Sequence, residues 1–105
     1  MSQDAFMTLL NPNIWIAVEH RQTALSLIVK AETAQNKRAR IAAEAAAYRA
    51  DKAITVFEEA STTIRQQARA VAIIEAGLVH LDMCERHLKR ANDLIFSLEQ
   101  DAKAG

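Results

Sequence analysis

Residues 39–60 read ARIAAEAAAYRADKAITVFEEA, and this stretch decides the fold. Along one helical stripe with alternating spacings of four and three, six of its seven positions are alanine and the seventh is Phe57. Alanine is the strongest helix former, but its side chain buries so little area that a neighbouring helix must approach unusually closely. The stretch therefore predicts a helix that packs tightly against a second helix with larger side chains.

Residues 64–95 supply that second helix, because Ile, Val and Leu recur there at the same spacing. Folding this segment back over the alanines lets large side chains fill the space that small ones leave. The fold class predicted is all-α, with a long antiparallel helical hairpin that resembles a coiled coil and has an alanine-rich seam. The chain has 105 residues with 21 Ala, two Gly and one Pro, a composition and length that indicate a single helical domain over residues 1–105.

One heptad register extends without a shift from Trp15 to Ile95, and 18 of its 24 seam positions are apolar. The seam consists of two interleaved sets of positions. The first set is Trp15, Gln22, Val29, Asn36, Ala43, Ala50, Phe57, Ile64, Val71, Leu78, Glu85 and Asn92. The second set is Val18, Leu25, Glu32, Ala39, Ala46, Ala53, Ala60, Gln67, Ile74, Leu81, Leu88 and Ile95.

The helix boundaries rest on few signals. Asn11-Pro12 predicts the start of the first arm, because Asn caps free N–H groups and Pro is tolerated at the first helical position. Residues 1–11 then form an N-terminal segment, residues 12–60 the first arm, 63–100 the second arm and 101–105 a frayed tail. Hydroxyl groups at 61–63 predict the reversal, and Asn36 offers a further break within 33–37. If neither site breaks the helix, residues 12–100 form one rod of roughly 130 Å.

The second arm carries an additional apolar stripe on another face, which one partner helix cannot cover. We expect this stripe to mediate self-association into a homodimer, a four-helix bundle of two hairpins. Its members are Ile73, Gly77, Cys84, Ala91, Leu94 and Leu98.

Near the amino terminus, Ile14, Trp15, Ile16 and Val18 point all round the first arm. A single neighbouring helix cannot bury all four side chains. They are predicted to bind a partner protein, with Trp15 as the aromatic anchor; burial under the N-terminal segment is the alternative.

His80, Met83, Cys84 and His87 share one helical stripe and include ligands that suit zinc or copper. A metal-binding helical bundle that uses His80, Cys84 and His87 is therefore an alternative function. The favoured interpretation is that Met83 and Cys84 pack in an apolar face with the histidines at its edge, so no cofactor is expected.

The remaining features restrict the class of protein. The 13 basic side chains balance 13 acidic ones, which argues against binding to nucleic acid, although a small nucleic-acid-associated regulator stays an alternative. A single cysteine, the lack of a secretory signal and the lack of a long apolar segment predict a cytoplasmic protein without a transmembrane segment. No phosphate loop or catalytic triad motif occurs, so we expect no enzyme but a non-enzymatic interaction module such as an adaptor, assembly factor or chaperone-like subunit.

Overall fold

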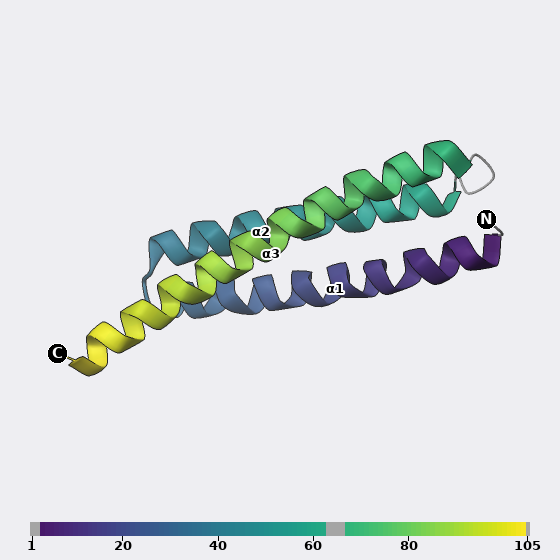
Figure 1. Ribbon diagram of the computed structural model, residues 1–105. Helices are drawn as coiled ribbons and strands as arrows, with labels where there is room; N and C mark the ends of the chain where they lie inside the picture. Colours follow the sequence, from purple (N-terminus) through teal and green to yellow (C-terminus); the bar gives the residue numbers. More distant parts are fainter. Residues whose placement is uncertain (1–2, 63–66, 105) are drawn as a thin grey trace.

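In the residues that it describes, the computed structural model contains three α-helices, and successive helices run in opposite directions (Figure 1). Their bounds are Gln3–Thr33 for α1, Lys37–Thr62 for α2 and Gln67–Ala104 for α3. The structure describes the backbone of residues 3–62 and 67–104 and the side chains of residues 7–62 and 69–96. α2 packs extensively against both of the other helices, whereas α1 and α3 contact each other much less. The result is a rod of 59 × 17 × 16 Å, and α3 extends past the turn between α1 and α2 (Figure 1).

The predicted all-α class is confirmed, but the predicted first arm is two helices rather than one. The chain reverses between Thr33 and Lys37, at the break that the sequence left open. α2 ends at Thr62, and the predicted cap at Thr63 lies outside the described residues. In its described residues the protein is therefore an antiparallel three-helix array, not a two-helix hairpin or one continuous helix.

The first reversal is built from a specific pattern of backbone hydrogen bonds. Asn36 N–H donates to the Ala31 carbonyl at 2.8 Å and Gln35 N–H donates to the Glu32 carbonyl at 3.1 Å, the Schellman arrangement that closes a helix. This closure places Gln35 in the left-handed region, with φ of 56°. Asn36 then starts the next helix, because its Oδ1 accepts the Ala39 N–H at 3.1 Å.

The predicted start at Asn11-Pro12 is wrong, because α1 begins at Gln3 and Pro12 lies inside it. A proline there loses a backbone hydrogen bond and disturbs the preceding turn. The Asn13 side chain donates a hydrogen bond to the Leu9 carbonyl at 3.1 Å, one turn earlier in the helix. Leu10, which directly precedes Asn11-Pro12, is completely buried, and its packing stabilises the helix through Pro12.

The predicted register is correct in α2 and only partly correct elsewhere. All seven seam positions of α2 are buried: Ala39, Ala43, Ala46, Ala50, Ala53, Phe57 and Ala60. In α3 the large seam residues Ile74, Leu81 and Ile95 are buried as predicted. The first set of seam positions is displaced by one residue in α3. Instead of the predicted positions 71, 78, 85 and 92, the buried residues are Ala70, Gly77, Cys84 and Ala91. Val71 and Leu78, which the register placed inside, are exposed.

Gly77 has a packing role that explains its position in the middle of α3. A Cβ atom added at this residue would lie 2.5 Å from Cε1 of Phe57, far inside van der Waals contact. Phe57 is the largest completely buried side chain of the described residues, and it packs in the cluster that contains Ile74 and Leu81. The glycine therefore makes room for the aromatic ring of the facing helix.

Candidate interaction surface

The outer face of α1 carries an apolar ridge formed by Trp15, Val18, Leu25 and Val29. The exposed fraction is 68% for Trp15, 62% for Val29 and 44% for Leu25, while Val18 is partly buried. With Gln22 between them, these residues are spaced three, four, three and four apart. This is the spacing by which one helix presents a continuous stripe to another helix.

The ridge is exposed because α1 buries a different stripe. Leu10, Ala17, Ala24 and Ala31 recur every seven residues and are all completely buried. At 3.6 residues per turn, this buried stripe lies roughly 120° around the helix from the α1 ridge. α1 thus has two apolar faces: the inner one combines three alanines with Leu10 and Leu27, and the outer one carries Trp15, Leu25 and Val29.

The four residues of the predicted amino-terminal binding site do not form one surface. Ile14 is partly buried and packs against the core cluster that contains Leu10. Trp15 and Val18 belong to the α1 ridge, whereas Ile16 lies on the side of α1 that also carries the exposed Leu9, seven residues earlier. Consecutive helical residues point about 100° apart, which is why the structure separates them.

The predicted self-association stripe of α3 is largely covered within the molecule. Gly77, Cys84 and Ala91 are buried, and Cys84 packs in a cluster with Ala24 and Ala46 from the other two helices. Ile73 and Leu94 are partly buried against the core clusters, and the side chain of Leu98 lies outside the described residues. The additional helix at the amino terminus supplies the cover for which the sequence suggested a second copy.

The predicted metal-binding stripe does not assemble as a ligand set. Among the side chains that the structure describes, no group of three or more His, Cys, Asp and Glu is placed to hold a metal ion. Burial, assisted by the negative charge of Glu85, raises the pKa of Cys84 to about 11, so the thiol stays protonated at neutral pH. His80 and His87 are only partly buried and lie at the edge of the helix interface, as does Met83.

His80 has a partner on α2 instead. The Arg49 guanidinium donates to Nδ1 of His80 at 2.9 Å, so this nitrogen carries no proton in the arrangement observed. Burial lowers the pKa of His80, and the positive charges of Arg49 and Lys52 lower it further. A neutral imidazole is therefore part of the contact between α2 and α3.

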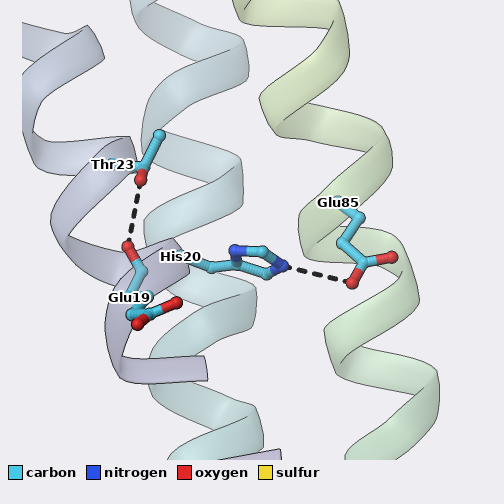
Figure 2. Close-up of polar contacts among 4 residues, drawn as sticks. All are labelled: Glu19, His20, Thr23 and Glu85. Carbon is cyan, nitrogen blue, oxygen red and sulfur yellow. Dashed lines mark hydrogen bonds and ion pairs between the residues drawn. The ribbon is translucent and has the colours of Figure 1, made fainter. Parts of the chain in front are cut away.

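Two polar contacts hold α1 in place beside the other helices. Nε2 of His20 donates to Oε1 of Glu85 at 3.1 Å, and Figure 2 shows the imidazole reaching from α1 to α3. The Arg21 Nε atom lies 2.6 Å from Oδ1 of Asp51 on α2. Both contacts join residues far apart in the sequence, so no local pattern could have predicted them. They flank the buried alanine stripe and leave the α1 ridge facing outward.

Searches of protein-family models, of curated proteins and of solved structures each find no match to this chain. In the part of the chain that the structure describes, no helix is both long and apolar enough to cross a membrane.

Proposed function

We propose that this protein is a non-enzymatic helical interaction module, and that the α1 ridge docks against the α1 ridge of a second copy. The observation that carries the proposal is the exposure of Trp15, Leu25 and Val29 at coiled-coil spacing, on a helix that buries alanines on another face. Burial of a Val or Leu side chain contributes roughly 1.5–3 kcal/mol, so a fold that leaves them outside has unused apolar area.

The arrangement of the ridge favours a second copy as its occupant. Trp15 lies seven residues before Gln22 and Val29 lies seven after it, while Val18 and Leu25 lie four before and three after. A twofold axis near Gln22 therefore brings Trp15 of each copy toward Val29 of the other in an antiparallel crossing, and self-complementarity of this kind is what a symmetric dimer requires. The two Gln22 amides meet at the axis, where each can donate and accept a hydrogen bond.

The homodimer proposed here differs in its interface from the four-helix bundle that the sequence suggested. Its contact is made by α1 rather than by the stripe of α3, and each copy contributes three helices. An adaptor or assembly factor acts through such helix faces and needs no catalytic group. The docking of a different protein on the same ridge is the competing outcome.

Sedimentation equilibrium over low to high micromolar concentrations tests the proposal, with Val29→Glu as the disruptive variant. We expect a wild-type dimer and a monomeric Val29→Glu, because the new carboxylate is buried at the interface. Val79→Glu is the matched control, since Val79 is 59% exposed on α3 and lies outside the ridge; it leaves the dimer intact. A wild-type protein that stays monomeric at high micromolar concentration excludes the second copy as the occupant.

A further inference from the structure

α2 and α3 form an open groove near the amino-terminal end of α2, and all of its described lining residues belong to these two helices. Its volume is about 860 Å³. The groove is lined by Arg38, Ile41, Ala42, Ala45, Arg86, His87, Lys89, Arg90, Asp93 and Leu94. We call it the basic groove.

The charge of the basic groove departs strongly from that of the chain. Four cationic side chains lie around it, whereas Asp93 is the one acidic side chain among the described lining residues. The whole chain has a net charge of zero, so positive charge is concentrated here. Nε of Arg86 lies 3.1 Å from Oδ2 of Asp82, which offsets part of one charge. Arg38, Lys89 and Arg90 form no ion pair with the side chains that the structure describes.

The floor of the groove is apolar. Ile41 is 53% exposed, although it is one of the larger aliphatic side chains of α2, and Leu94 is partly buried beside the adjacent core cluster. The small side chains of Ala42 and Ala45 complete the apolar part of the lining. Residues 86–94 extend along about 12 Å of α3 at 1.5 Å per residue, which matches roughly two turns of a docked helix.

From this combination we propose that the basic groove binds an acidic amphipathic helix of a partner protein. Its apolar face would pack on Ile41 and Leu94 while its carboxylates meet Arg38, Lys89 and Arg90. Helix-in-groove recognition uses apolar anchors of this kind, and complementary charge around the contact increases the rate of association and its specificity. An enclosed small-molecule site buries most of its ligand, which an open groove does not do. Binding to single-stranded nucleic acid relies on aromatic stacking, and among the lining residues that the structure describes the imidazole of His87 is the one aromatic side chain.

A fluorescent model peptide tests the inference. The probe is an acetylated peptide of roughly 16 residues, with Leu along one helical face and Glu and Ala elsewhere, and its binding is followed by fluorescence anisotropy. We expect saturable binding to the wild-type protein and at least about a tenfold loss of affinity in the double variant Arg38→Glu/Arg90→Glu. Affinity should also fall as salt rises, because the rim charges are screened.

The controls separate the groove from general electrostatics and from the α1 ridge. Arg69→Glu reverses an exposed charge on the same helix, about 30 Å from Arg90, and should keep the affinity within about twofold. Val29→Glu, which alters the α1 ridge, should bind the peptide as the wild type does. Ile41→Ser tests the floor and should weaken binding several-fold without unfolding the protein, because Ile41 is largely exposed.

Three results would overturn the inference. The first is no saturable binding at peptide concentrations up to about 1 mM, which corresponds to a negligible affinity. The second is equal binding by the wild type and the Arg38→Glu/Arg90→Glu variant. The third is equally tight binding of a scrambled peptide of the same composition, or of a single-stranded oligonucleotide, which would mean that the protein responds to negative charge alone.

Discussion

The largest apolar side chains of α1 and α2 have opposite positions: Phe57 is completely buried in α2, whereas Trp15 is mostly exposed on α1. Both belong to the first set of positions of the predicted seam. α2 packs against both of the other helices and buries a wide face, so both sets of its seam positions point inward. α1 meets its neighbours with a different stripe, in which Leu10 and Leu27 are buried with three alanines, and most of its predicted seam is left outside. The same heptad spacing of apolar residues therefore corresponds to internal packing in α2 and to an exposed surface in α1.

Replacing each aromatic residue by alanine tests this difference most strongly. Phe57→Ala should lower the free energy of unfolding by about 3–5 kcal/mol, because it removes a buried ring and leaves a cavity opposite Gly77. Trp15→Ala should change the stability of the monomer by less than about 0.5 kcal/mol. Urea unfolding, at a protein concentration below the dissociation constant of the dimer, measures both free energies. A loss of several kcal/mol in Trp15→Ala would place this side chain in a core and remove the α1 ridge.

Two adjacent residues of α1 provide a sharper comparison. Ala24 is completely buried in contact with Cys84 and Ala46, whereas Leu25 is substantially exposed on the α1 ridge. Ala24→Leu should overpack the interior and destabilise the protein by about 1–3 kcal/mol. Leu25→Ala should have little effect on unfolding but should weaken dimerisation. The opposite ranking of the two urea midpoints would show that the register of α1 is displaced.

The sequence was sufficient to predict what depends on side-chain size and spacing. It predicted the helical class, the close packing of the alanine seam in α2 and the burial of Ile74, Leu81 and Ile95. Two stripes of α3 are apolar, and the sequence assigned the one with Gly77 and Cys84 to self-association with a second copy, whereas both residues are buried within one chain. Only the position of a third helix selects one stripe over the other.

The candidate sites were less predictable than the fold for the same reason. A helix can be recognised as having two apolar faces, but which face is covered depends on tertiary packing. The exposure of Trp15 agrees with the docking role predicted for it, while that role stays a prediction. The basic groove combines α2 and α3 residues that are about fifty positions apart, such as Arg38 and Arg90, and no local motif connects them.

A substitution in the turn between α1 and α2 is expected to have a smaller effect on stability, and this effect is stabilising. Gln35 adopts a left-handed conformation that is unfavourable for a residue with a Cβ atom but natural for glycine. Gln35→Gly should therefore raise the free energy of unfolding by about 0.5–1 kcal/mol, with a higher melting temperature in calorimetry. Gln35→Ala is the control, because alanine keeps the Cβ atom and should produce no such gain. Stabilisation by both variants would assign the effect to the lost side chain instead.

The smallest expected effect is a pH dependence at His80, which belongs to the α2 and α3 contact and not to α1. Its pKa lies below the ordinary 6.5 in the folded protein, chiefly through burial and then through Arg49 and Lys52. The unfolded chain therefore takes up a proton before the folded one does, and stability falls as the pH drops below about 6.5. His80→Gln keeps an acceptor for Arg49 but cannot titrate. Its urea midpoint should decrease less than that of the wild type between about pH 7.5 and pH 5.5, whereas parallel decreases would show that the titration of His80 is not linked to folding.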